Sequence, residues 1–180
     1  MTAVDIREPK PSDRTELEAL ITEHFSAGSS YEVTLGLDDP TFELRVATTD
    51  EQLLGVMAVN ALSDAQAVAE EMHFFDSTEH LPTANRYGLL ETGYVRDGFT
   101  GQGIGSQLLK RIHELADKLD TDVLIADCWY HGGSDSPEKL MDSHGYDTVR
   151  REPLEEPFDA CPKCIAECTC QKALAVRRTT

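Results

Sequence analysis

The stretch GFTGQGIGSQLL, residues 98–109, joins a glycine-rich segment to the start of an apolar helical pattern. It places four glycines within eight positions and then continues directly into leucines. Glycine lets the backbone approach a ligand closely, and the first turn of a helix offers N–H groups to an anion. We therefore predict a phosphate-binding loop that runs into a helix.

Two widespread phosphate-binding loops do not fit this spacing. A P-loop ends in Gly-Lys-Ser/Thr, whereas here Ser106 follows Gly105 with no lysine between them. A dinucleotide-binding fingerprint has G-x-G-x-x-G in the first crossover of the fold. Here Gly101, Gly103 and Gly105 alternate, and several predicted elements precede them. Spacing excludes both alternatives.

The sequence on either side of the loop predicts a strand, a helix and a second strand. LLETGYV (89–95) is rich in β-formers, and DVLIADCW (122–129) has the continuous apolar run of a strand covered on both faces. An amphipathic helix lies between them, with one apolar stripe made of Ile104, Leu108, Ile112, Leu115 and Leu119. This order predicts a right-handed parallel crossover.

The remaining elements predict an α/β (α+β) fold with a single mixed, mostly antiparallel sheet around the central parallel crossover. A capping box of Asp13 and Glu16 opens the first helix, AGSS (27–30) ends it, and TDEQ (49–52) suits a hairpin turn. Further helices are expected over 64–75 and from Ser136 to Gly145, and further strands over 4–9, 42–48, 53–60, 146–152 and 173–178. We expect residues 1–180 to form one domain.

The stretch ETGYVRDGFTGQGIGSQLLKRI (91–112) resembles the central motif of the GNAT superfamily of acyl-CoA N-acyltransferases. The order of elements over 4–152 is also similar to that family. The motif positions kept in register are Glu91, Val95, Gly101, Gly103, Ile104, Gly105, Leu108 and Leu109. The resemblance implies a GNAT-like fold and transfer of an acetyl group from acetyl-CoA to an amine by direct attack.

By this resemblance, the glycine loop holds coenzyme A. Backbone N–H groups at the helix start suit its pyrophosphate, and the preceding strand pairs with the pantetheine arm. Thr100 replaces the family's usual Arg or Gln, so Lys110 or Arg111 are the candidates for other phosphates. The implied cofactor-binding residues are Tyr94, Val95, Thr100, Gly101, Gln102, Gly103, Ile104, Gly105 and Ser106.

The resemblance also implies a general base. Glu91 matches the family's strand glutamate, although a polar residue on a half-covered sheet is an equal interpretation. The family's acid is a tyrosine on a later helix, where this chain has Met141. The acid is therefore unassigned, with Tyr94, Tyr130 and His131 as substitutes that also suit core or rim positions. Cys128, inside an apolar strand, is expected to be a buried thiol without a chemical role.

Four cysteines follow the predicted core of the fold, in the segment CPKCIAECTC. Four soft ligands that begin with C-x-x-C suit tetrahedral structural zinc, and the alternatives are free or redox thiols. We predict a zinc knuckle over 157–170, inserted before the last strand. Its ligands are Cys161, Cys164, Cys168 and Cys170.

The net charge and the lengths of the apolar runs indicate where the protein is located and which partners it can bind. The 180 residues carry a net charge of −17, which repels duplex nucleic acid. No apolar run is long enough to span a membrane and no apolar signal core begins the chain, so we expect a cytoplasmic protein. Because the acids are spread along the chain, adaptation to a salt-saturated cytoplasm (a halophilic source) is favoured over attraction of cationic substrates.

Two other functions stay open beside the acetyltransferase. One is a non-catalytic acyl-CoA-binding module, which the departures at Thr100 and Met141 suggest. The other is a zinc-dependent interaction protein that uses the cysteine segment. The sequence leaves open the acceptor amine and the oligomeric state, a homodimer included.

Overall fold

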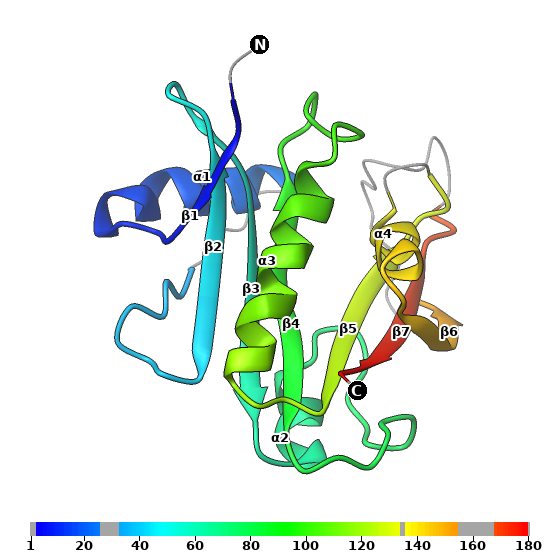
Figure 1. Ribbon diagram of the computed structural model, residues 1–180. Helices are drawn as coiled ribbons and strands as arrows, with labels where there is room; N and C mark the ends of the chain where they lie inside the picture. Colours follow the sequence, from blue (N-terminus) through cyan, green and yellow to red (C-terminus); the bar gives the residue numbers. More distant parts are fainter. Residues whose placement is uncertain (1–2, 26–32, 134–135, 155–167, 180) are drawn as a thin grey trace. The chain divides into compact units, whose positions relative to one another are not determined.

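The protein is described by a computed structural model over residues 3–25, 33–133, 136–154 and 168–179. Seven strands form one sheet in the order β1-β2-β3-β4-β5-β7-β6 (Figure 1). They are β1 (Asp5–Arg7), β2 (Phe42–Thr48), β3 (Leu53–Leu62), β4 (Tyr87–Val95), β5 (Val123–Tyr130), β6 (Asp147–Pro153) and β7 (Gln171–Arg178). The helices are η1 (Pro11–Asp13), α1 (Arg14–Phe25), α2 (Ala65–Glu71), α3 (Ile104–Lys118) and α4 (Pro137–Ser143).

The pairing of the strands confirms the predicted fold class. β4 and β5 are parallel, and α3 connects them. β1–β2, β2–β3, β5–β7 and β6–β7 are antiparallel. The predicted turn at 49–52 joins β2 to β3, with the Thr49 N–H donating to Gln52 O at 3.0 Å. Among the described residues, no helix has both the length and the apolar character needed to cross a bilayer.

The chain divides into two compact units. The first comprises Met1–Asn60 and Glu91–Lys118, and the second Ala61–Leu90 and Leu119–Thr180. The expectation of a single domain stays a prediction.

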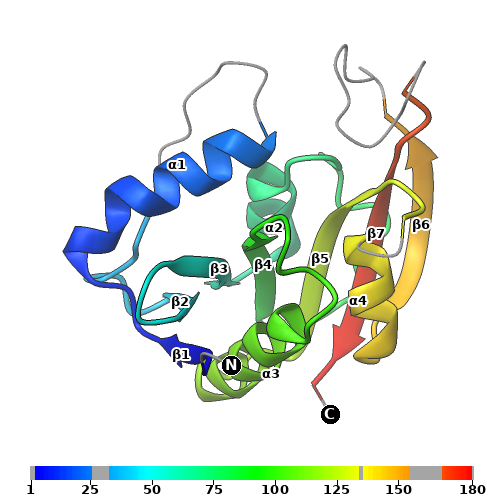
Figure 2. The same cartoon turned by 90° about the horizontal axis from the view of Figure 1, so that it is seen from above.

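The first unit buries one apolar face of β2 against α1. Strand side chains alternate, so Leu44 and Val46 join Leu17 and Leu20 of α1 in one buried cluster. The opposite face of β2 packs against α3. Figure 2 shows α1 and α3 on opposite sides of the β1–β2–β3 strands.

The predicted capping box is replaced by two other contacts. Asp13 points back along the chain, where its Oδ2 accepts from Lys10 N–H at 2.7 Å and pairs with Arg7 Nη1 at 2.7 Å. Glu16 instead accepts from Leu53 N–H at 2.9 Å. Asp13 therefore connects η1 to β1, and Glu16 connects α1 to β3, which helix-local spacing does not reveal.

Gly55 allows β3, β4 and α3 to approach one another. A Cβ added there would lie 2.9 Å from Tyr94 O and 3.2 Å from Leu108 Cδ1. A contact of 2.9 Å to backbone cannot be relieved by moving a side chain. This position therefore needs glycine for packing.

We expect Gly55→Ala to lower the free energy of unfolding by about 1–3 kcal/mol, because the added methyl overpacks this junction. Denaturant unfolding measures the change. The control is Gly93→Ala in β4, where an added Cβ meets only Met57 Cε at 3.7 Å. Equal stability of the two variants contradicts the prediction.

The second unit packs α2 against one face of β4, β5 and β7. Val68 and Ala69 of α2 share a buried cluster with Leu89, Ile125 and Leu174. α2 begins where expected, since Asp64 Oδ1 accepts from Ala67 N–H at 2.8 Å. It ends at Glu71 rather than residue 75, because Met72 is extended and the next amides bind elsewhere.

Candidate functional site

The glycine loop begins at a fixed point on β3. Arg96 N–H donates to Leu54 O at 2.7 Å, and Arg96 Nε donates to Leu53 O at 2.9 Å. Phe99 N–H then donates to Arg96 O at 3.0 Å and turns the chain. The end of β4 is thereby held while the loop projects beyond it, as Figure 1 shows.

Three glycines of the loop adopt left-handed backbone conformations. Gly98, Gly101 and Gly103 have φ angles of 89°, 75° and 82°. No atom of the described chain lies within 4 Å of a Cβ added at any of them. These glycines therefore permit the left-handed backbone of the loop and leave open space beside it. Gly55, in contrast, is required because of close packing.

The loop runs directly into α3, and its last amides form the first turn of that helix. Gln107 N–H donates to Gly103 O at 3.0 Å and closes this turn. The N–H groups of Ile104, Gly105 and Ser106 therefore occupy the helix start, where the helix supplies no acceptor of its own and the dipole favours an anion. A 15-residue helix makes this a strong N-terminal site.

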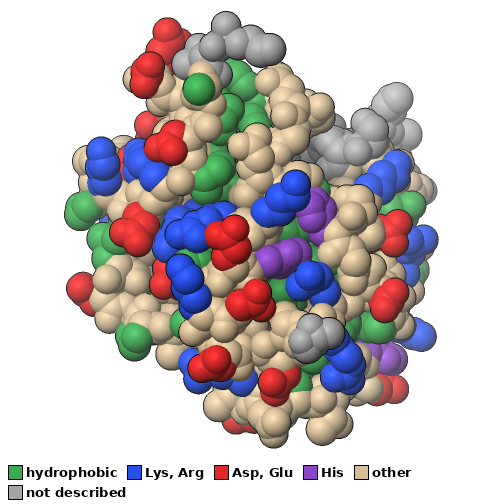
Figure 3. Space-filling model, in the orientation of Figure 1, with side chains coloured by type: hydrophobic (Ala, Val, Ile, Leu, Met, Phe, Trp, Pro, Cys, Tyr) green, Lys and Arg blue, Asp and Glu red, His purple; other side chains and the backbone are tan. Residues whose placement is uncertain are grey.

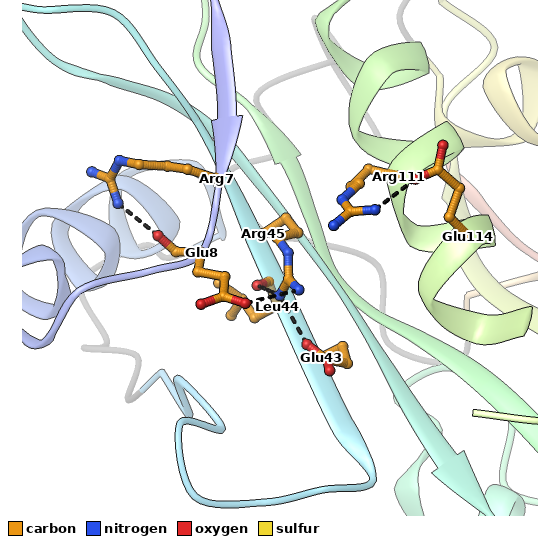
Figure 4. Close-up of polar contacts among 7 residues, drawn as sticks. All are labelled: Arg7, Glu8, Glu43, Leu44, Arg45, Arg111 and Glu114. Carbon is orange, nitrogen blue, oxygen red and sulfur yellow. Dashed lines mark hydrogen bonds and ion pairs between the residues drawn. The ribbon is translucent and has the colours of Figure 1, made fainter. Parts of the chain in front are cut away.

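The two basic candidates on α3, Lys110 and Arg111, differ in whether they form an ion pair within the described part of the protein. Arg111 Nη1 pairs with Glu114 Oε2 at 2.6 Å (Figure 4), so this charge is already compensated. Lys110 is exposed, and no ion pair is found for it among the described residues. Of the two, Lys110 is the better candidate for an outer phosphate.

The neighbouring arginine on β2 is structural. Arg45 is 5% exposed, and its guanidinium bonds Glu43 at 2.9 Å, Leu44 O at 2.7 Å and Glu8 at 3.4 Å (Figure 4). These partners satisfy its charge within the protein. Arg45 is therefore not available to an incoming phosphate.

β4 carries the candidate base and a strained residue beside it. Glu91 is half-buried, and Thr92 has a φ of 52°. A non-glycine residue in this region costs about 1–2 kcal/mol, and such strain persists mainly at bulges and functional sites. The regular alternation of β4 therefore breaks directly after Glu91.

The backbone beyond this break has a defined direction. Tyr94 O lies toward Gly55 of β3, and Arg96 N–H also donates to β3. Because alternate residues of a strand direct their N–H and C=O groups to opposite sides, the main chain of Val95 points away from β3. Val95 is thus placed to pair with an added extended ligand, while the side chain of Tyr94 packs in the apolar cluster around α1.

The predicted substitutes for the acid lie in the second unit or in the core. The Arg151 guanidinium lies 4.1 Å from the ring centre of Tyr130, and His131 Nδ1 accepts from Gly133 N–H at 3.1 Å. Met141 is buried. The acid therefore stays unassigned.

Cys128 has the inert role that the sequence indicated. It is 7% exposed, and burial raises the pKa of its thiol to about 12. A thiol with such a pKa is scarcely ionised at neutral pH and is a poor nucleophile. It packs as a small hydrophobic residue.

The cysteine segment is described only in part. Cys161 and Cys164 lie outside the described residues, whereas Cys168 is half-buried and Cys170 is buried before β7. Among the described residues, no cluster of His, Cys, Asp or Glu is suited to hold a metal ion. The zinc knuckle therefore stays a prediction.

Sequence reasoning missed Asp127. This residue lies in β5, where its Oδ2 accepts from the backbone N–H groups of His73 and Phe74 at 2.6 and 2.7 Å. Burial raises the pKa of its carboxyl. The available signal was an acid in the middle of the apolar run DVLIADCW.

On the face drawn in Figure 3, acidic side chains are scattered among basic ones. A field that steers substrates gathers charges of one sign around a site.

Among the comparisons with known proteins, the one with solved structures bears on the fold. No protein-family model matches the sequence, and no curated protein matches it. Solved structures match over nearly the whole chain. A GNAT-family acetyltransferase of Streptococcus pneumoniae has a TM-score of 0.67 at 15% identity, covering 98% of this chain and 99% of its own.

Two further solved structures contain bound ligands. The Salmonella typhimurium protein yncA, with its cofactor acetyl-CoA, has a TM-score of 0.65 at 13% identity, covering 99% of this chain and 95% of its own. Arabidopsis thaliana NAA60, with a bisubstrate analogue, has a TM-score of 0.66 at 13% identity and covers 98% of both chains. The chain therefore has the fold of the GNAT acetyltransferases.

Proposed function

We propose that this protein is an acyl-CoA-dependent N-acyltransferase that transfers an acetyl group from acetyl-CoA to an amine. The observation that carries the proposal is the bare, left-handed glycine loop between β4 and the start of α3. The shared fold supports it, since one protein of that fold holds acetyl-CoA.

The loop and β4 divide the binding of the cofactor between them. Amides from Thr100 to Ser106 hold the pyrophosphate, and Val95 pairs with the pantetheine arm as an added strand does. Tyr94 completes the cofactor-binding set. Its other members lie within the stretch of amides from Thr100 to Ser106 and are Gly101, Gln102, Gly103, Ile104 and Gly105. Acetyl-CoA is a cosubstrate here, because its acetyl group is consumed.

The chemistry is direct transfer. A neutral amine attacks the thioester carbonyl, the C–N bond forms, the C–S bond breaks and the coenzyme A thiolate leaves. Glu91 takes the proton that the amine nitrogen loses. Some other donor protonates the thiolate, and Met141 at the family's tyrosine position excludes that side chain from the role.

The test is thiol release from acetyl-CoA in the presence of a panel of primary amines, with the acetylated amine identified by mass spectrometry. Amine-dependent release is the expected result. Calorimetry with coenzyme A measures binding separately. If coenzyme A binds but no amine is acetylated, the protein is the non-catalytic acyl-CoA-binding module instead.

We further propose that Cys161, Cys164, Cys168 and Cys170 bind one structural zinc ion in a knuckle over 157–170. Elemental analysis of the purified protein is expected to find about one zinc per chain, the ratio for a four-cysteine site. Cys161→Ser is expected to lose it, and Cys128→Ser serves as the control outside the segment. Zinc-free wild-type protein contradicts the knuckle and the zinc-dependent interaction function together.

The proposal also covers the cellular environment and the partners of the protein. The protein works in a salt-rich cytoplasm, with an amine-bearing acceptor and without nucleic acid or membrane partners. The net charge of −17 supports this, since it repels anionic polymers and keeps a protein soluble at high ionic strength.

A further inference from the structure

Arg96, the residue that follows β4, is held by β3 at two points. Its backbone N–H donates to Leu54 O at 2.7 Å, and its Nε donates to Leu53 O at 2.9 Å. β3 has one more residue than β2 at this position, Leu54, so the pairing register shifts there. A bulge of this kind redirects the groups beside it. Two consecutive carbonyls of β3 therefore accept hydrogen bonds from the same arginine.

The side chain of Arg96 completes a ring of contacts around the main chain of Leu53. Glu16 of α1 accepts from Leu53 N–H at 2.9 Å, and the same oxygen lies 3.6 Å from Arg96 Nη2. Leu53 is buried, and its N–H and C=O are engaged by these two side chains. The ring thereby connects α1, β3 and the end of β4, all within the first unit.

The glycine loop starts from this ring. Phe99 N–H donates to Arg96 O at 3.0 Å and makes the first turn of the loop. Between Asp97 and Gly103, the hydrogen bonds found in the described part of the chain stay inside the loop, such as Gln102 Nε2 to Gly98 O at 3.3 Å. Glycine-rich backbone has much conformational freedom of its own. The attachment at Arg96 and the start of α3 therefore decide where the loop amides lie.

The contacts of Arg96 need an arginine. The guanidinium carries N–H donors on Nε and on both Nη atoms in one rigid plane, so a single side chain serves Leu53 O and Glu16 together. A lysine carries the same charge on one nitrogen at the end of a flexible stem. Replacing Arg96 with lysine therefore keeps the charge and loses the geometry.

The first unit contains a second ring of the same composition. Arg14 Nη1 donates to Val33 O at 2.7 Å, and Glu18 Oε1 accepts from Val33 N–H at 3.4 Å. Arg14 Nη1 and Glu18 Oε1 lie 3.8 Å apart. This ring holds the segment before β2 instead of the glycine loop. Arg14 and Glu18 are therefore matched controls for Arg96 and Glu16.

We propose that Arg96 is the positioning residue of the glycine loop and that Glu16 holds Arg96 in place. This inference rests on the proposed function. Arg96 acts through the loop: it fixes where the chain leaves β4, and hence where the amides of 100–106 point, which a binding site needs to within a fraction of an ångström. α1 thus contributes to cofactor binding through Glu16, which is not a member of the cofactor-binding set.

The test compares Arg96→Lys with Arg14→Lys. Because lysine keeps the positive charge, a loss of affinity does not come from weaker attraction to the anionic cofactor. The acyl donors are acetyl-CoA and S-acetylpantetheine, which ends before the pyrophosphate. Calorimetry measures the Kd for coenzyme A, and initial rates with one amine measure kcat/KM for each donor.

For Arg96→Lys we expect the Kd for coenzyme A and the KM of acetyl-CoA to rise about tenfold or more, the size of one charge-assisted hydrogen bond. The kcat/KM for S-acetylpantetheine stays at the wild-type value, because this donor has no group for the loop to bind. Arg14→Lys keeps both values. An unchanged Kd, an equal fall for both donors, or equal losses in the two variants overturns the proposal.

Glu16→Ala distinguishes positioning from simple electrostatics by the sign of its effect. Removal of a negative charge near an anionic ligand would by itself tighten binding. Loss of the hold on Arg96 instead weakens it, and we expect the Kd for coenzyme A to rise about two- to fivefold, the size of an exposed ion pair. Glu18→Ala leaves the Kd unchanged. A Kd that is equal or lower in Glu16→Ala overturns the role of Glu16.

Amide exchange in the free protein keeps this inference separate from the proposed function. The Phe99 N–H is expected to exchange about tenfold faster in Arg96→Lys than in the wild type or in Arg14→Lys, because its acceptor, Arg96 O, is no longer fixed. Faster exchange supports the hold on the loop even if the wild type binds no coenzyme A, a result that contradicts the proposed function. Unchanged exchange overturns the inference even if acetyl transfer is found.

Discussion

Gly103→Ala raises the Kd for coenzyme A by about 10- to 100-fold, which corresponds to about 1.4–2.8 kcal/mol. The added methyl enters the open space beside the amides at the start of α3, where the pyrophosphate lies in the proposed complex. Calorimetric titration measures this change. The left-handed backbone at φ 82° also makes the variant less stable, by about 1–2 kcal/mol.

Gly98→Ala separates the two effects. Gly98 has a similar φ of 89° and equally open surroundings, but it precedes the amides of 100–106. Its alanine variant carries the same backbone strain and is expected to keep wild-type affinity. If both variants weaken coenzyme A equally, the loop acts only through its shape and the placement of the pyrophosphate is wrong.

Glu91→Gln lowers kcat by about 10²- to 10⁴-fold, the range for removing a general base. The amide cannot take the proton of the attacking amine, while its size and its place in β4 are kept. The Kd for coenzyme A is expected to stay within about twofold, because the base does not contact the pyrophosphate in this mechanism. Steady-state kinetics over a range of pH measures the loss, and the rate of the variant should no longer depend on the ionisation of residue 91.

The matched control is Glu43→Gln. Glu43 is another half-buried strand glutamate of the same unit, and it pairs with Arg45 at 2.9 Å. Its variant is expected to keep kcat although it loses an ion pair. Full activity of Glu91→Gln would leave the chemistry without an assigned base.

The order of the elements was predictable because each has a strong local signal. The run of β-forming residues at 42–48 and the apolar stripe at 104–119 correspond to β2 and α3 as observed. The glycine loop was predictable for the same reason, since alternating glycines before a helix restrict what the backbone does there. The fold class therefore followed from short-range pattern.

The misses involve contacts and backbone conformations that the local pattern does not show. α2 stops at Glu71, and the amides of residues 73 and 74 bind Asp127, which lies 54 and 53 positions further along the chain, respectively. Asp13 and Glu16 leave the expected capping box for partners on β1 and β3. The strain at Thr92 likewise has no signature in the residue type, since threonine ordinarily favours strands.

The buried guanidinium of β2 has a consequence for ionic strength. At about 1 M salt the Debye length falls to about 3 Å, so repulsion among exposed carboxylates is largely cancelled. Arg45, enclosed beside Glu43, is shielded from mobile ions and keeps its attraction. Concentrated electrolyte therefore weakens the repulsion among exposed carboxylates more than it weakens the attraction between Arg45 and Glu43 in the first unit.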